Sequence, residues 1–133
     1  MLRLEIVTPE RKIVDTEADS VTVPTASGEV GLLPNHAPLI SALKPGILTY
    51  TRGSSTERML VTGGFVEVNR DRVSVLADAA ESADEIDAEA ARSARKQAEQ
   101  QLEESWQQPA DETDSLRDQL DAADARLRLA AGK

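Results

Sequence analysis

The stretch that decides the fold is Gly28 to Ile40, GEVGLLPNHAPLI, together with LKPGIL at Leu43 to Leu48 and GGFVEV at Gly63 to Val68. The first segment combines two glycines, two prolines and the only histidine of the chain with apolar residues at strand spacing. Such a mixture is typical of backbone that turns sharply between strands, and it argues against a helix. We therefore expect a tightly shaped loop between strands over residues 28–40.

The chain around this stretch, from residue 2 to 77, is interrupted every few positions by Pro, Gly, Asn or Asp. Short runs rich in β-branched residues lie between the interruptions: 4–8, 20–25, 47–51, 58–62, 65–69 and 72–77. This pattern predicts an all-β sandwich of about ten short antiparallel strands. Asn69 to Arg72 and Thr51 to Ser55 have the composition of hairpin turns.

The composition changes after Asp78, where Ala, Glu, Gln, Asp, Arg and Leu dominate and helix is favoured. Two apolar stripes follow, the first at Ile86, Ala90, Ala94, Ala98, Leu102 and Trp106, the second at Leu116, Leu120, Ala123, Leu127 and Ala130. A break at 108–110 separates them, which predicts a C-terminal antiparallel two-helix hairpin. We expect an N-terminal sandwich domain over 1–80 and a helical hairpin over 81–133. The small alanine side chains make the hairpin only marginally stable.

Charge and composition narrow the class of partner. The net charge is −9, and residues 81–133 alone carry 7 basic and 14 acidic groups. Such a chain repels phosphate backbones and anionic lipid, so we expect no nucleic-acid partner. Aromatic content is 2% and cysteine is absent, which excludes an aromatic-lined groove and a thiolate metal site. No run of about 18 apolar residues occurs, so we expect no direct membrane insertion. A protein is therefore the kind of partner that we expect.

The residue types needed for catalysis are not gathered in any readable pattern. His36 lies between Pro34 and Pro38, without the serine and carboxylate that a histidine base would need. A metal site would have this one histidine as its imidazole ligand, and neither a P-loop nor a GxGxxG spacing occurs. We therefore predict that the chain is not an enzyme, has no catalytic residue and holds no metal.

The motifs GEVGLLPNHAPL, KPG and GGFVEV, continued by VLADAAESADEID at Val75 to Asp87, resemble the epsilon subunit of the rotary (F-type) ATP synthase. The resemblance implies docking on the central gamma shaft and on the polar loops of the membrane ring. It assigns Glu29 and Gly31 to the loop that meets the ring, and it assigns His36, Ala37 and Pro38 to the neighbourhood of the shaft. Which single residue contacts ring or shaft stays open.

The resemblance also concerns a nucleotide motif, I/L-D-x-x-R-A, at the start of the first tail helix. Glu81, Ile86, Asp87 and Ala91 fit this motif, but its arginine position is Ala90 and the position of a later arginine is Gln97. Arg92 is two residues away, which corresponds to about 200° around a helix. We therefore expect no ATP cofactor on the tail, and we interpret Asp84 and Asp87 as residues that cap and charge a helix N-terminus.

The helical tail has two interpretations. It is either a permanently docked hairpin or, as the resemblance implies, a switch that extends into the catalytic head and regulates ATP hydrolysis. The six acids and four bases of the last helix oppose contact with an acidic loop there. We predict that deleting residues 81–133 leaves assembly and coupling largely intact.

The resemblance therefore implies a non-catalytic subunit that couples the membrane ring to the gamma shaft of a proton-translocating ATP synthase. Its location would be peripheral, on the cytoplasmic face of the bacterial inner membrane, and the sequence leaves proton and sodium coupling both open. The alternatives are an adaptor module of another assembly, with a coiled-coil tail that dimerises through Leu116, Leu120 and Leu127, and a small β-sandwich hydrolase or lyase.

Overall fold

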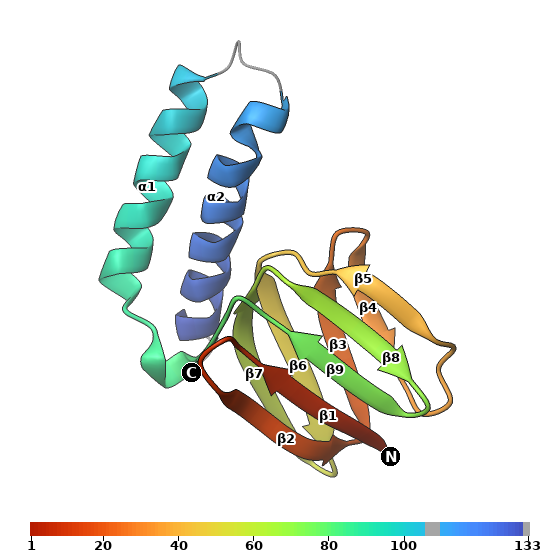
Figure 1. Cartoon of the computed structure of the whole chain (residues 1–133). Coiled ribbons are helices and arrows are strands. Elements are labelled where there is room, and N and C mark those ends of the chain that lie inside the picture. Colours follow the sequence, from red (N-terminus) through yellow and green to blue (C-terminus); the bar gives the residue numbers. More distant parts are fainter. Residues whose placement is uncertain (106–109, 132–133) are drawn as a thin grey trace.

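The computed structural model describes residues 1–105 and 110–131, as ten strands, one 3₁₀ turn and two helices (Figure 1). The strands are β1 (Leu2–Val7), β2 (Lys12–Ala18), β3 (Ser20–Thr25), β4 (Gly28–Leu32), β5 (Leu39–Ala42), β6 (Gly46–Arg52), β7 (Ser55–Thr62), β8 (Phe65–Asn69), β9 (Arg72–Leu76) and β10 (Ala79–Ser82). The 3₁₀ turn η1 (Ala83–Glu85) leads to helices α1 (Ala88–Glu104) and α2 (Ala110–Ala131). The predicted fold class is confirmed.

The strands form two five-stranded sheets that face each other. Sheet A has the order β2-β1-β9-β8-β5, and sheet B has the order β10-β7-β6-β3-β4. The pairs are antiparallel except that β1 runs parallel to β9. The N-terminal strand is thereby placed inside sheet A, beside a strand from the end of the sandwich. The last strand, β10, extends to Ser82 and pairs with β7.

The prediction of a loop throughout residues 28–40 is wrong at both ends. Gly28–Leu32 is strand β4, in which Val30 and Leu32 pair with β3 and direct their side chains to the core. Strand β5 begins at Leu39, so the connecting loop covers only residues 33–38. The alternating apolar residues form a strand despite the two glycines, because Gly28 and Gly31 lie at exposed positions of an edge strand.

The core between the sheets consists of aliphatic side chains that alternate along each strand. Leu2, Leu4 and Ile6 of β1 are fully buried, as are Val73 and Val75 of the neighbouring β9. Turns of defined geometry join these strands. The β8–β9 turn has its two central residues, Arg70 and Asp71, at φ of 51° and 61°, which is the primed geometry that a two-residue hairpin favours. Both predicted hairpin turns are confirmed.

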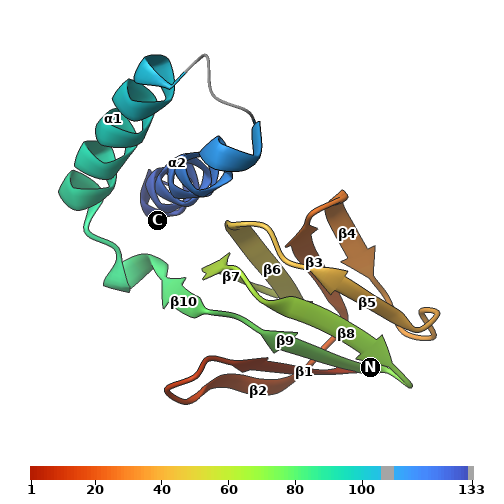
Figure 2. The same ribbon diagram turned by 45° about the horizontal axis from the view of Figure 1, so that its top comes forward.

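The two helices lie antiparallel, with α2 between α1 and the sandwich (Figure 2). Asp87 caps α1 by accepting a hydrogen bond from the backbone N–H of Ala90 at 3.1 Å, as predicted. The predicted first stripe is confirmed at Ala98, which is buried, and wrong at Ala90, which is exposed while its neighbour Ala91 is buried. A strict four-residue repeat drifts by about 40° per step around a helix, so it cannot stay on one face. Trp106, Gln108 and Pro109 lie outside the described residues.

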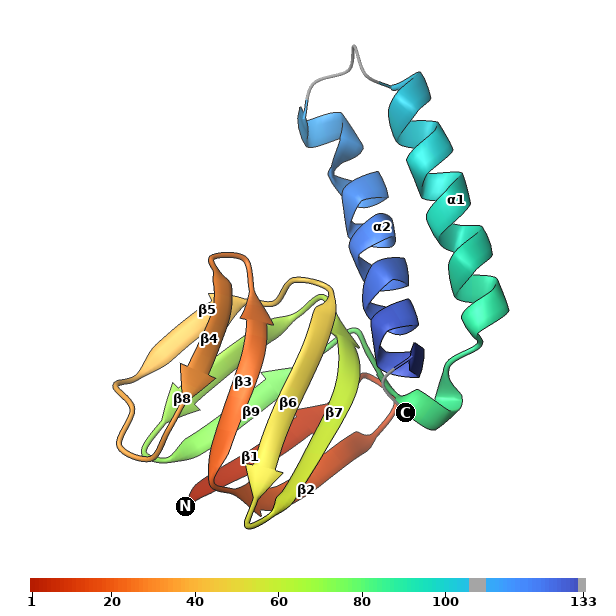
Figure 3. The ribbon, with the colours of Figure 1, turned by 180° about the vertical axis from the view of Figure 1, so that it is seen from behind.

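The hairpin contacts the sandwich through the C-terminal half of α2, which lies against β6 and β7 (Figure 3). This contact has its own apolar cluster, separate from the core: Leu60, Ala125 and Leu129, flanked by Ile47, Ala83 and Ile86. The predicted second stripe did not include Ala125 or Leu129, because α2 buries one face against α1 and another against sheet B. In the part of the chain that the structure describes, neither helix has the length and apolar character needed to cross a membrane.

Candidate functional site

The outer face of sheet A carries a row of apolar side chains across four strands, which we call the apolar row. Ala42 of β5 pairs with Phe65 of β8, Phe65 pairs with Leu76 of β9, and Leu76 pairs with Val7 of β1. Phe65 is 57% exposed and Leu76 53%. Ile40, two residues before Ala42 on the same strand, is 73% exposed. Side chains of this size, gathered on one face, indicate a surface that a partner covers.

Beside the row, charged side chains of β1, β2 and β9 form ion pairs on the same face. Arg72 of β9 binds Glu5 of β1, and Lys12 of β2 lies 3.7 Å from Glu5 and 3.5 Å from Asp15. The pKa of Glu5 lies below its ordinary value, because Arg72 donates hydrogen bonds to its carboxylate and adds a favourable charge. The apolar row therefore borders an area of paired charges, and polar surroundings of this kind are typical of the rims of protein interfaces.

Sequence reasoning did not single out the apolar row, although a signal for it is present. In FVEVN, Val66 and Val68 alternate as core residues, so Phe65 must point to the opposite face. The same argument places Leu76 outside, since Val73 and Val75 point inward. The only phenylalanine of the chain is thus exposed by the register of its strand.

The loop between β4 and β5 holds three of the predicted site residues, His36, Ala37 and Pro38. Asn35 has φ of 67°, and its backbone N–H donates to the Asp71 carboxylate at 2.6 Å, which ties the loop to the β8–β9 turn. The ring Nδ1 of His36 lies 2.6 Å from the carbonyl oxygen of Ala37. Ala37 and Pro38 are exposed, and Pro38 lines a shallow pocket with Ile40. This loop therefore lies beside the β8–β9 turn, at the opposite end of β5 from Ala42, and Ile40 lies between it and the apolar row.

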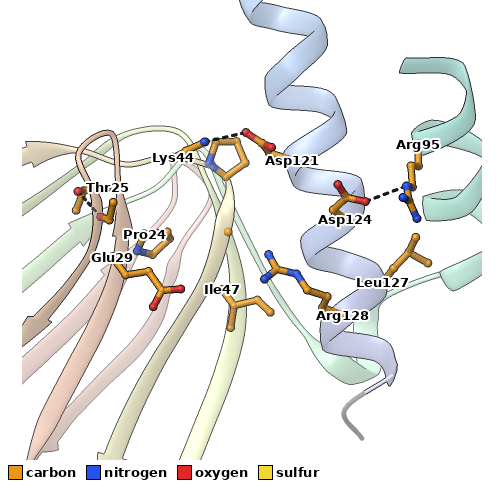
Figure 4. A pocket seen from close by; sticks show the side chains of 13 residues that line it. Pro24, Thr25, Glu29, Lys44, Ile47, Arg95, Asp121, Asp124, Leu127 and Arg128 are labelled. Atoms are coloured by element: carbon orange, nitrogen blue, oxygen red, sulfur yellow. Dashed lines mark hydrogen bonds and ion pairs between the residues drawn. The ribbon is translucent and has the colours of Figure 1, made fainter. Parts of the chain in front are cut away.

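The other two predicted residues, Glu29 and Gly31, lie on β4 at the edge of sheet B, with both side-chain positions on its outer face. The structure does not bring them together with His36, which follows in the loop beyond the strand. Glu29 instead points into a groove between sheet B and the hairpin (Figure 4). The five residues therefore form two surfaces rather than one.

The groove has a volume of about 600 Å³ and is open to solvent. Its walls come from β3, β4 and β6 and from both helices, with Ile47 on the sheet side and Leu127 on α2. One ion pair crosses its upper part, Lys44 with Asp121 at 3.4 Å, and a second, Arg95 with Asp124 at 3.0 Å, joins α1 to α2. The charges that line the groove are thus largely paired within the chain.

The residues that fit the nucleotide motif are all used in internal contacts. The Glu81 carboxylate accepts two hydrogen bonds from Arg126 of α2, at 3.0 and 3.3 Å. Ile86 packs in the cluster beneath α2, Asp87 caps α1, and Ala91 is buried at 2% exposure. Together these four residues fix how α1 starts and how α2 sits on sheet B.

Residues 1–83 match the family model described as the β-sandwich domain of the ATP synthase delta/epsilon chain. The fold and the matched segment define the class, a β-sandwich subunit of ATP synthases. The chain is 51% identical over 100 residues to the ATP synthase epsilon chain of Desulforamulus reducens, covering 75% of this chain and 76% of that one. It is 43% identical over 110 residues to the epsilon chain of Halalkalibacterium halodurans, covering 83% of each. The chain belongs to the ATP synthase epsilon chain family, and the predicted resemblance is confirmed.

Solved structures agree with this assignment. A chain of the Euglena gracilis mitochondrial ATP synthase, in a structure of OSCP, F1 and c-ring, superposes with a TM-score of 0.78 at 25% identity. The match covers 98% of this chain and 81% of that one, so it includes the helical hairpin. A chain of the Tetrahymena thermophila mitochondrial enzyme, with a TM-score of 0.55 and 16% identity, shares the fold.

Proposed function

We propose that this chain is a non-catalytic subunit of the central stalk of a proton-translocating ATP synthase, where it joins the membrane ring to the gamma shaft. Family membership and the likeness to a chain solved together with F1 and c-ring support this role. The subunit would lie peripherally on the cytoplasmic face of the bacterial inner membrane. Torque transmission demands a stiff connector, and a sandwich whose strands are all paired on a fully buried aliphatic core is stiff.

The apolar row is the observation that carries the proposal. Phe65 and Leu76 are large, exposed and held on adjacent strands in the interior of a sheet, so a partner could bury them without reordering backbone. We assign this row, together with the loop residues His36, Ala37 and Pro38 at the opposite end of β5, to the gamma subunit. Glu29 and Gly31, at the edge of the other sheet, we assign to the polar loops of the ring.

The test is binding of the full chain to purified gamma subunit, with Leu76→Glu compared with Ser74→Glu. Both positions lie on the outer face of β9, two residues apart, so each variant adds the same charge to the same strand. Truncating or charging a central apolar anchor typically costs 2 kcal/mol or more, so we expect Leu76→Glu to weaken binding by about 30-fold or more. Ser74→Glu should bind within about threefold of the unaltered chain. Equal binding by both variants would contradict the assignment.

We further infer that the hairpin contacts the catalytic head and influences ATP hydrolysis, and that it does so without holding ATP. The motif positions for phosphate are Ala90 and Gln97, both exposed and uncharged, and Glu81 is already bound by Arg126. Calorimetric titration of the isolated chain with ATP should give no sub-millimolar binding. A dissociation constant below 1 mM would contradict the inference that the hairpin does not hold ATP, because it corresponds to a favourable binding free energy of about 4 kcal/mol or more.

A further inference from the structure

The hairpin is attached to the sandwich by few apolar contacts. Leu60 is the one large side chain from the sheet that is fully buried there, and from α2 it meets Ala125 and Leu129. This cluster does not join the core between the sheets, so separating the hairpin from sheet B would leave the core intact. With Ile47, Ala83 and Ile86 at its edge, this cluster is small, and polar groups add a further contribution to the attachment of α2.

An ion pair supplies that contribution at the edge of the cluster. Glu81 of β10 stands in register with Leu60 of β7, and Arg126 of α2 reaches it with two hydrogen bonds. The two side chains are only 27% and 28% exposed. In every other ion pair among the described residues, at least one side chain is about half exposed. A two-point, partly buried pair is stronger and less screened than surface pairs.

A second pair lies on the opposite side of the same contact. Lys44, just before β6, is 3.4 Å from Asp121 of α2. These side chains, labelled in Figure 4, are 54% and 35% exposed, so the pair is weaker than that of Glu81 and Arg126. Arg95 and Asp124, by contrast, join α1 to α2 and do not contribute to attachment of the hairpin to the sheet.

We propose that Glu81 and Arg126 form an electrostatic latch, assisted by Lys44 and Asp121, which keeps the hairpin on sheet B and releases it as ionic strength rises. The screening length falls from about 10 Å at 0.1 M salt to about 3 Å at 1 M, so the assisting pair weakens first and the partly buried pair later. The latch regulates the hairpin, and only its consequence for ATP hydrolysis rests on the proposed function. The chain itself sets the closed state, with no ligand required.

The test measures the distance between sandwich and hairpin in the isolated full-length chain. Because the chain has no cysteine, Ser54→Cys and Ser115→Cys give two unique, exposed labelling sites, one on the β6–β7 turn and one on α2. Pulsed electron resonance between spin labels at these sites reports the docked and detached populations. At 50 mM NaCl we expect one short distance, and at 1 M NaCl a second, longer population.

Glu81→Gln should increase the detached population at 50 mM NaCl by about tenfold, because Arg126 loses a charged partner. Exchanging the charges, with Glu81→Arg and Arg126→Glu together, should restore the docked distance. Asp124→Asn is the matched control, since it breaks an ion pair inside the hairpin and should leave the docked fraction unchanged.

A Glu81→Gln chain with the distances and salt response of the unaltered chain would overturn the latch, as would a charge exchange that stays detached. Circular dichroism on each variant establishes that the sandwich is folded. No synthase subunit takes part, so failure here is distinct from failure of the gamma-binding experiment.

Discussion

The sandwich and the hairpin differ in the kind of contact that stabilises the interior of each. Leu4, Leu48 and their neighbours are fully buried between the sheets, and each such aliphatic side chain contributes about 1.5–3 kcal/mol. In the hairpin, the buried side chains include Ala91, Ala98 and Ala123, each of which buries little more than one methyl group, or about 0.8 kcal/mol. The comparison teaches that one region is built to keep its shape and the other to be displaced.

The largest effect should come from a glycine of the sandwich. A side chain at Gly64, where φ is +86°, would place its Cβ 1.7 Å from the carbonyl oxygen of Leu76. We expect Gly64→Ala to lower the free energy of unfolding by about 4 kcal/mol or more. Gly53→Ala is the control, with φ of +59° and open space around the new Cβ, and it should cost about 1 kcal/mol. Urea unfolding followed by circular dichroism measures both, and equal losses would contradict the close approach at Gly64.

Two leucine truncations sharpen the comparison between the regions. Leu4→Ala opens a cavity in the core and should destabilise the whole sandwich by about 2–5 kcal/mol. Leu60→Ala removes the main sheet contact of α2, so its cost should appear as hydrogen exchange in α2 that is at least about tenfold faster. Exchange of the β1 and β9 amides should change little. If Leu60→Ala loosened β1 and α2 equally, the two regions would form one cooperative unit.

A smaller effect is expected at the start of the hairpin. Asp87 accepts the backbone hydrogen bond of Ala90, so Asp87→Ala should destabilise α1 by about 1 kcal/mol. Asp87→Asn keeps the cap and should cost only a few tenths. Helical ellipticity during thermal unfolding distinguishes them. A loss that is equal for Asn and Ala would mean that charge, not capping, matters at this position.

The smallest effect concerns the link between the regions. The backbone N–H and hydroxyl of Ser82 donate to the Glu85 carboxylate, which lowers the pKa of Glu85 below its ordinary value of 4.5. A lowered folded-state pKa stabilises the fold above pH 4.5, and this stabilisation is lost as pH falls through the folded value. The melting temperature of the unaltered chain should therefore exceed that of Glu85→Gln at pH 7 and converge with it in acid. A difference that persists below pH 3 would refute the linkage.

Much of the sandwich could be predicted because its information is local. Period-two alternation identified β8 and β9, and the turns 69–72 and 51–55 were readable from their residue types. The parallel pairing of β1 with β9 could not be read, since it joins segments about 70 residues apart and no local pattern specifies it. Strand β4 was missed for a different reason. Its glycines predicted a loop, but they occupy exposed edge positions where they cost little stability.

The hairpin and the candidate site were less predictable because each depends on contacts between regions. Ala125 and Leu129 are buried by sheet B, so a stripe calculated for a helix with one buried face omits them. The pairing of Glu81 with Arg126 spans 45 residues and has no signal in sequence spacing. The exposed Phe65, by contrast, followed from strand register alone and could have been predicted.

Reconstitution of the synthase without the hairpin tests most directly the claim that the sandwich couples ring to shaft while the hairpin controls ATP hydrolysis. The deletion should begin at residue 87, after η1, because β10 extends to Ser82 and completes sheet B. With the remaining subunits supplied, we predict that the 1–86 chain supports assembly and proton-coupled ATP synthesis at about the rate of the full chain, while control of ATP hydrolysis is lost. An enzyme that failed to assemble or was uncoupled, although the 1–86 chain had the circular dichroism spectrum of a folded sandwich, would contradict the account.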